Sequence, residues 1–178
     1  MLNGDGLRVV LWLSGCSHNC YKCQNPQTHN PNSGILFDEK AEEELFRELS
    51  KDYISGLTLT GGDPLHENNL DDILRIVNKF RLLMPEKTIW IYTGYKLKFN
   101  ECFADKQPFS FSPKQNDGEG LMNDFIRCEI VKSIDVLVDG QYIDSQRNIS
   151  AKWRGSDNQR VIDVQESLKK GEIVLWCD

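Results

Sequence analysis

The sequence predicts an α/β fold in which a mostly parallel, curved sheet forms an open, partial (β/α) barrel. The first observation is that apolar, strand-like segments alternate with segments whose apolar residues recur at helical spacing. Such alternation favours parallel strands joined by right-handed helical crossovers. The second is that the chain holds only about four or five strand–helix units, too few to close an eight-stranded barrel. Its 178 residues suit one domain, which we expect to span residues 1–178.

Four segments have the composition of short buried strands. They cover residues 7–13, 57–60, 88–92 and 134–138. The turns that follow them are Ser14-Gly15, Gly61-Gly62, Thr93-Gly94 and Asp139-Gly140. Because the carboxyl ends of parallel strands share one edge of a sheet, where α/β proteins bind ligands, we expect these four turns to lie together.

Two helices and one insertion are predicted between the strands. Asp38 is a suitable N-cap for a helix that reaches Leu49, and residues 70–80 form a second apolar face that ends before Pro85. Residues 108–120 contain two prolines and two glycines. They predict an exposed loop, within an insertion at about residues 97–121.

Charge and hydropathy exclude several classes of protein. The net charge of −6 leaves no general basic field to gather nucleic acid or an anionic membrane, so we expect neither as a partner. The longest apolar runs are five residues, far below a membrane span, and the first fifteen residues lack the basic region of a signal peptide. We therefore expect a cytoplasmic protein.

Three of the six cysteines form a C-x3-C-x2-C pattern just after the first predicted strand, at Cys16, Cys20 and Cys23. Closed zinc sites and electron-transfer clusters commonly use four protein ligands, so three cysteines favour a 4Fe-4S cluster with one iron open to a substrate. The alternative is a zinc site completed by His18 or His29 in a small zinc-stabilised interaction module. The remaining cysteines are not expected to be ligands: Cys102, Cys128 and Cys177.

The cysteine pattern, followed after the second strand by Gly61-Gly62-Asp63-Pro64, resembles the radical S-adenosylmethionine enzymes. Further stretches are similar to the family of proteins that activate anaerobic ribonucleoside-triphosphate reductases. These stretches are residues 15–20 with Asn25, 90–95, 135–140 and 153–160. The resemblance extends from about Asn3 to Arg160.

The resemblance implies both cofactors and an activity. A reduced 4Fe-4S cluster cleaves S-adenosylmethionine, and the resulting 5′-deoxyadenosyl radical removes a hydrogen atom from a glycine of the reductase. It also implies a low-potential electron donor such as flavodoxin. The nearer alternatives are an activating enzyme for another glycyl-radical enzyme and a radical S-adenosylmethionine enzyme that acts on a small molecule.

The same resemblance implies roles for individual residues. Cys16, Cys20 and Cys23 hold the cluster, and no catalytic acid or base is expected because the chemistry is homolytic. The implied cofactor-binding residues are Lys22, Gln24, Gly61, Gly62, Asp63, Thr93 and Arg154. The backbone of Lys22 and Gln24 flanks the adenosyl group, although the family commonly has an aromatic residue where this chain has Lys22. Carbonyls of Gly61 and Gly62 accept hydrogen bonds from the methionine ammonium, since glycine lets backbone approach a ligand closely.

A basic stretch interrupts this acidic chain. Residues 147–160 contain one acid, Asp157, and four bases: Arg147, Lys152, Arg154 and Arg160. An arginine fork suits a carboxylate, so the stretch is a candidate local anion site. We expect Arg154 to belong to a polar lid over the cofactor or the incoming glycine loop. The alternative is a solvated basic turn.

Overall fold

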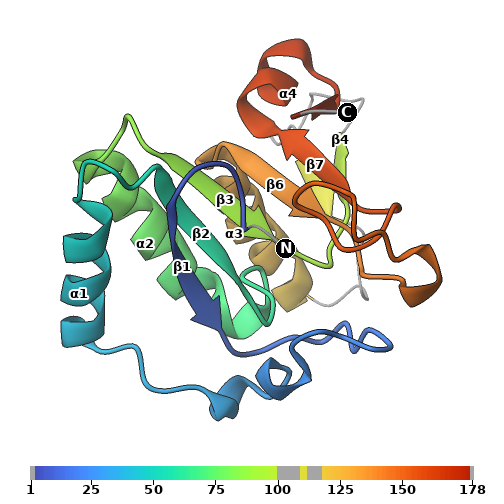
Figure 1. Ribbon diagram of the computed structural model, residues 1–178, viewed down its shortest axis with the longest axis horizontal. Coiled ribbons are helices and arrows are strands. Elements are labelled where there is room, and N and C mark those ends of the chain that lie inside the picture. Colours follow the sequence, from blue (N-terminus) through green and yellow to red (C-terminus); the bar gives the residue numbers. More distant parts are fainter. Residues whose placement is uncertain (1–2, 100–108, 112–117, 177–178) are drawn as a thin grey trace.

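The computed structural model describes residues 3–99, 109–111 and 118–176 (Figure 1). Within these residues lies a six-stranded sheet of order β1-β2-β3-β6-β7-β8. Its strands are Arg8–Leu13, Gly56–Gly61, Thr88–Tyr92, Val136–Asp139, Arg160–Asp163 and Val174–Leu175, in that order. Strands β1, β2, β3 and β6 are parallel. Strand β7 pairs antiparallel with both β6 and β8, so β7 alone of the six runs in the opposite direction. The predicted α/β fold with a mostly parallel sheet is confirmed, and the antiparallel pairing of β7 with β6 and β8 was not anticipated.

The helices begin and end where their sequences favour it. The four α-helices in the described residues are α1 (Glu39–Leu49), α2 (Leu70–Leu83), α3 (Gly118–Lys132) and α4 (Val164–Lys170). The Asp38 side chain accepts a hydrogen bond from the Ala41 backbone amide, which confirms the predicted N-cap of α1. Short 3-10 helices occupy Pro26–Thr28, Pro31–Ser33, Glu67–Asn69 and Asp144–Gln146. None of the helices in this part of the chain is long and apolar enough to cross a membrane.

The two faces of the sheet are covered differently. Helices α2 and α3 lie behind the sheet in Figure 1, and they pack on alternate strand residues such as Leu57, Ile89 and Leu137. The opposite face carries a smaller cluster around Trp90, against which Trp153 packs at a ring-centroid distance of 5.2 Å. A long loop, residues 140–159, therefore covers the face that the helices leave open.

The region of the expected insertion contains strands as well as loop. β4 (Leu97–Phe99) pairs antiparallel with β5 (Phe109–Phe111), and α3 begins at Gly118. The expectation of a loop throughout residues 108–120 is wrong at β5, because Phe111 is buried and stacks edge-on against Tyr95. Residues 100–108 and 112–117 lie outside the described residues, as does Cys102.

The carboxyl ends of β1, β2, β3 and β6 meet at one edge of the sheet. The segment after β1, residues 14–25, carries the three clustered cysteines, and we refer to it as the cysteine loop. The turn after β2, the turn after β3 and the 140–159 loop reach the same edge, where residues of all four segments line one cavity. This confirms that the turns predicted from the sequence lie together.

Candidate functional site

Cys16, Cys20 and Cys23 line this cavity at the carboxyl edge of the sheet, and all three thiols are free. Five of the residues that the sequence nominated for cofactor binding line the same cavity: Gln24, Gly61, Gly62, Asp63 and Thr93. Cys128 lies elsewhere, buried on α3 in the core, and Cys177 lies outside the described residues. The structure therefore separates the three clustered thiols from Cys128.

The cysteine loop bends back on itself so that its thiols face the cavity. Asn19 and Lys22 have left-handed backbone angles, with φ of 47° and 54°, and the Cys23 amide donates to the Cys20 carbonyl at 3.1 Å. Burial raises the pKa of Cys16 to about 11, and burial also raises the pKa of Cys20. Both thiols therefore hold their protons at neutral pH until a metal displaces them.

The donor set fits an iron-sulfur cluster better than a single metal ion. In the described residues, no group of three His, Cys, Asp or Glu side chains is placed to hold one ion. The thiolates of a 4Fe-4S cluster bind different irons and stand farther apart than the ligands of one zinc. His18, which could have completed a zinc site, instead has its Nε2 2.9 Å from Asp63 Oδ2.

Gly61 and Gly62 are required by the close approach of three backbone segments. A Cβ on Gly61, whose φ is 110°, would lie 2.7 Å from the backbone nitrogen and oxygen of Leu13. A Cβ on Gly62 would lie 2.5 Å from the Gly15 carbonyl oxygen and 3.0 Å from that of Thr28. The Gly62 amide also donates to the Leu13 carbonyl at 2.7 Å. The two glycines thus lock the turn after β2 against the start of the cysteine loop.

Asp63 connects the segments that form the cavity. Its buried carboxylate accepts hydrogen bonds from the Thr93 hydroxyl at 2.9 and 3.0 Å, from the Gly94 amide at 2.9 Å and from the Leu65 amide at 2.9 Å. His18 Nε2 makes a further close contact, with the separation of an ion pair but without hydrogen-bond geometry. Protein donors therefore occupy both carboxylate oxygens, and Asp63 and Thr93 bond to each other.

The 140–159 loop is tied directly to the cysteine loop. Gln141 Nε2 donates to the His18 carbonyl at 2.8 Å, and Lys22 Nζ lies 2.9 Å from Asp144 Oδ2. Gln159 holds the loop itself, because its Oε1 accepts from the Gly155 amide and its Nε2 donates to the Gly140 carbonyl, both at 2.9 Å. The cavity therefore has one wall from each loop.

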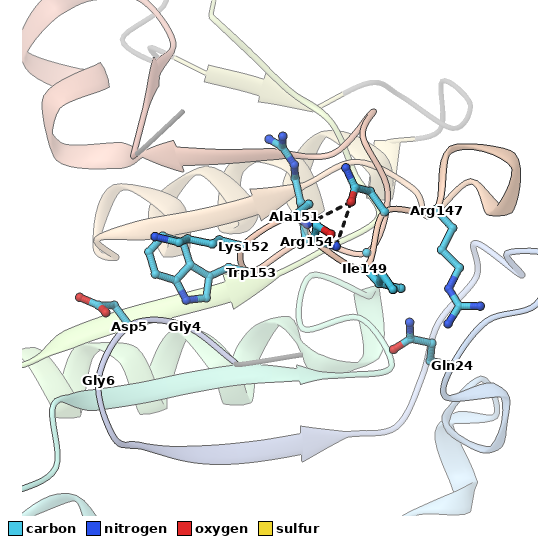
Figure 2. Close-up of a pocket in the computed structure, with 13 residues that line it drawn as sticks. Gly4, Asp5, Gly6, Gln24, Arg147, Ile149, Ala151, Lys152, Trp153 and Arg154 are labelled. Atoms are coloured by element: carbon cyan, nitrogen blue, oxygen red, sulfur yellow. Dashed lines mark hydrogen bonds between the residues drawn. The ribbon is translucent and has the colours of Figure 1, made fainter.

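Two nominated residues do not line this cavity. The Lys22 side chain is directed to Asp144, and Arg154 lines a neighbouring cavity together with Arg147 and Lys152 (Figure 2). Arg154 Nε is buried and has no hydrogen-bond partner in the described part of the chain.

The fourth base of the predicted anion site is not available to a ligand. Arg160 forms a two-pronged ion pair with Asp139, a carboxylate with no exposed surface, and donates to the Leu97 carbonyl at 2.8 Å. The expectation that all four bases of residues 147–160 form one anion site is therefore wrong at Arg160.

Sequence reasoning missed several residues of the cavity. Tyr142 lines it, and Gln141 donates to the His18 carbonyl at its wall. Gln159, which lies in the 153–160 stretch that carries the resemblance, lines it as well. His18 was considered only as a zinc ligand, although its place inside the cysteine pattern was a signal that it contributes to this site. Gln141 and Tyr142 lie in a loop without periodicity, so no local pattern identified them.

Comparisons with known proteins agree with this site. Residues 2–162 match the family model described as a 4Fe-4S single cluster domain. The anaerobic ribonucleoside-triphosphate reductase-activating protein of Enterobacteria phage T4 is 40% identical over 162 residues, which cover 90% of this chain and 86% of that protein. The proteins of the same name from Haemophilus influenzae and Escherichia coli K12 are each 37% identical, covering 89% and 90% of this chain and 89% and 91% of theirs. No solved structure matches the chain significantly. At these identities and coverages, the chain belongs to the family of anaerobic ribonucleoside-triphosphate reductase-activating proteins.

Proposed function

We propose that this protein is a radical S-adenosylmethionine enzyme that generates a glycyl radical on an anaerobic ribonucleoside-triphosphate reductase. The observation that carries the proposal is the set of three free thiols, Cys16, Cys20 and Cys23, in one cavity with the Gly61-Gly62 turn. Relatives named as activators of that reductase, similar over nearly the whole chain, support the identity of the partner. We also propose that residues 1–178 form a single domain with the architecture of a partial barrel. An insertion at about residues 97–121 is part of this proposed domain.

The cofactors supply the redox chemistry, and the residues of the chain bind the cofactors and orient them. When bound, a reduced 4Fe-4S cluster provides the electron that splits S-adenosylmethionine into methionine and the radical that takes a hydrogen atom from the glycine. The three thiolates would hold the cluster and leave one iron for the amino and carboxylate groups of the methionine moiety. Because Asp63 and Thr93 bond to protein groups, their contribution is to hold the turn after β2 and the end of β3 in register.

Other residues would orient the cofactor and keep water away. The carbonyls of Gly61 and Gly62 are proposed to accept from the methionine ammonium. The backbone at Lys22 and Gln24 is proposed to flank the adenosyl group, and Gln24 lines the cavity. Arg154 would close the site from the neighbouring cavity. A dry site matters because a primary carbon radical reacts with whatever group lies nearest.

The proposal is tested with anaerobically reconstituted protein, the whole reductase, S-adenosylmethionine and a reductant. We expect methionine and 5′-deoxyadenosine as products, together with a glycyl-radical signal on the reductase in electron paramagnetic resonance. Reduced flavodoxin in place of a chemical reductant tests the proposed electron donor. Iron- and sulfide-loaded protein that releases no 5′-deoxyadenosine, even with the reductase present, would contradict the proposal. The protein could release 5′-deoxyadenosine and form a radical on another glycyl-radical enzyme but not on this reductase. That result would assign the other enzyme as the partner.

A further inference from the structure

A second cavity adjoins the cysteine cavity on the open face of the sheet. It has a volume of about 640 Å³, within the range of about 300 to 1,000 Å³ that is typical of ligand sites. Gln24 and Gly155 line both this cavity and the cysteine cavity, so the two are direct neighbours. Figure 2 shows it between the 140–159 loop and the backbone of Gly4 and Gly6.

The cations that line this cavity form no hydrogen bond or close ion pair with protein groups in the described residues, although the hydrogen bond from Lys22 and, after it, the charge of Arg147 help to lower the pKa of nearby Asp144. Within the described residues, Arg147 and Arg154 donate no side-chain hydrogen bond and form no ion pair, and Lys152 contacts only the Trp153 ring, at 5.8 Å. The other six arginines of the chain each form a hydrogen bond or an ion pair: Arg8, Arg47, Arg75, Arg81, Arg127 and Arg160. The two arginines without a hydrogen bond or a close ion pair therefore line the same cavity, and the carboxylate among the lining residues is Asp5.

These cations are spread along the cavity rather than gathered at one point. Figure 2 shows Arg147 directed toward Gln24, Lys152 at the opposite end near Asp5, and Arg154 pointing away on a third side. A single compact anion would not reach both Arg147 and Lys152, and the Arg154 guanidinium points away from the space between them. The spacing instead suits an extended ligand that carries several separate carboxylates.

The loop that presents the cations is held in a defined shape. Trp153 has a left-handed φ of 60°, an unusual conformation for a bulky residue, and its ring packs edge-on against the buried Trp90. The Asn148 side chain accepts from the Ser150 and Ala151 amides at 2.9 and 3.2 Å. The loop is thus shaped before a ligand arrives, which reduces the entropy lost on binding.

We propose that this basic cavity is the docking surface for an acidic segment of the reductase. The inference rests on the proposed function, because a glycine that reaches the cysteine cavity brings the surrounding reductase surface over the adjoining cavity. The chain as a whole has a net charge of −6, so a negative partner surface is repelled over most of it and attracted here. The cavity would therefore set the orientation of the reductase as well as its affinity.

The test compares two charge-reversed variants of the cluster-loaded protein. Arg147→Glu with Lys152→Glu changes the cavity, and Lys40→Glu with Lys170→Glu makes the same charge change at exposed lysines on α1 and α4. The dissociation constant for the whole reductase is measured at low and high salt. Cleavage of S-adenosylmethionine without the reductase is measured in parallel.

We expect the cavity variant to bind the reductase at least tenfold more weakly at low salt, with a smaller difference at high salt, because screening weakens charge attraction. The control variant should bind within about twofold of the wild type, and cleavage without the reductase should be unchanged in both. Equal binding by the cavity variant and the wild type, or equal weakening in the control, overturns the docking site. The docking site is also overturned if the cavity variant no longer cleaves S-adenosylmethionine in the absence of the reductase, because these residues would then take part in the cleavage reaction. A wild-type protein that cleaves S-adenosylmethionine but never binds the reductase contradicts the proposed function instead.

Discussion

His18 Nε2 lies 2.9 Å from Asp63 Oδ2, and this contact joins the cysteine loop to the turn after β2. Both side chains are nearly inaccessible, at 8% and 2% exposure, so the pair is shielded from solvent. The His18 ring also stacks edge-on against Tyr95 at a centroid distance of 4.7 Å. The space for that ring exists because residue 94 is glycine, since a Cβ there would lie 2.4 Å from His18 Cδ2.

The first prediction is that Gly94→Ala acts through His18. Gly94 does not have a positive φ, so alanine meets the imidazole without backbone strain. We expect Gly94→Ala to destabilise the metal-free protein by about 1 to 3 kcal/mol, which is typical of overpacking, and to lower its iron content after reconstitution. In a His18→Ala background the same change should cost less than about 0.5 kcal/mol, because the clashing ring is gone. Denaturant unfolding of the wild type, the two single variants and the double variant measures the coupling between Gly94 and His18. Additive changes in the free energy of unfolding would contradict this prediction.

The second prediction concerns the cluster ligands. Alanine at Cys16, Cys20 or Cys23 should abolish cluster absorbance and turnover, because losing one of three protein ligands leaves the cluster poorly held. Cys128→Ala is the matched control, since Cys128 is buried in the core and not in the cavity. It should destabilise the fold modestly but keep full iron and sulfide per chain. Loss of iron in Cys128→Ala equal to that in the other three would show that the ligand assignment is wrong.

The third prediction concerns Arg154, whose buried Nε has no partner in the described residues. A charge-assisted hydrogen bond donated by a guanidinium contributes about 1.5 to 3 kcal/mol, and lysine lacks the planar fork. Arg154→Ala and Arg154→Lys should therefore keep their iron content but form the glycyl radical about tenfold to a hundredfold more slowly. Radical yield against time, measured by electron paramagnetic resonance, checks this. Arg75→Ala, an arginine on α2 away from the site, should form the radical at the wild-type rate. Wild-type rates in both Arg154 variants would show that Arg154 has no role at the site.

The fourth prediction is a pH dependence of stability from His66. Burial lowers the pKa of His66 below 6.5, and its Nδ1 accepts from the Asn68 amide at 3.3 Å, as a neutral imidazole can. Well above pH 6.5 the ring is neutral in both the folded and the unfolded chain, so its full contribution to the free energy of unfolding is present. As the pH falls below 6.5 the unfolded chain takes up a proton that the folded chain does not, and stability is lost until the folded pKa is reached.

The measurement is the free energy of unfolding of the metal-free protein as a function of pH. This residue contributes a slope of at most about 1.4 kcal/mol per pH unit. His66→Asn keeps a side-chain acceptor for the Asn68 amide but cannot take up a proton, so its slope below pH 6.5 should be smaller than that of the wild type. Identical slopes would assign the pH dependence to other groups.

Local sequence patterns were sufficient to predict much of the fold and the edge of the sheet at which the site lies. The strand over residues 88–92 has the predicted bounds, and α1 begins after Asp38 as its capping pattern requires. Parallel strands bring their carboxyl ends to one edge, so recognising the strands was enough to place Cys16, Gly61 and Thr93 together. The reason is that hydrophobic periodicity, capping and the direction of parallel strands depend on residues close in the chain or on general rules of topology.

Tertiary structure alone decided what the polar side chains do. Arg160 has the same local surroundings as the other bases of its stretch, yet it pairs with Asp139, 21 residues earlier, and leaves the anion site. Asp63 lines the cavity, and donors from Thr93 and Gly94, about 30 residues later, bond to its oxygens. Arg147 and Arg154 make no close ion pair in the described chain, and the 140–159 loop places both at the wall of one cavity. Such partners are chosen by which segments the sheet brings into contact, and that contact leaves no periodic signal in the sequence.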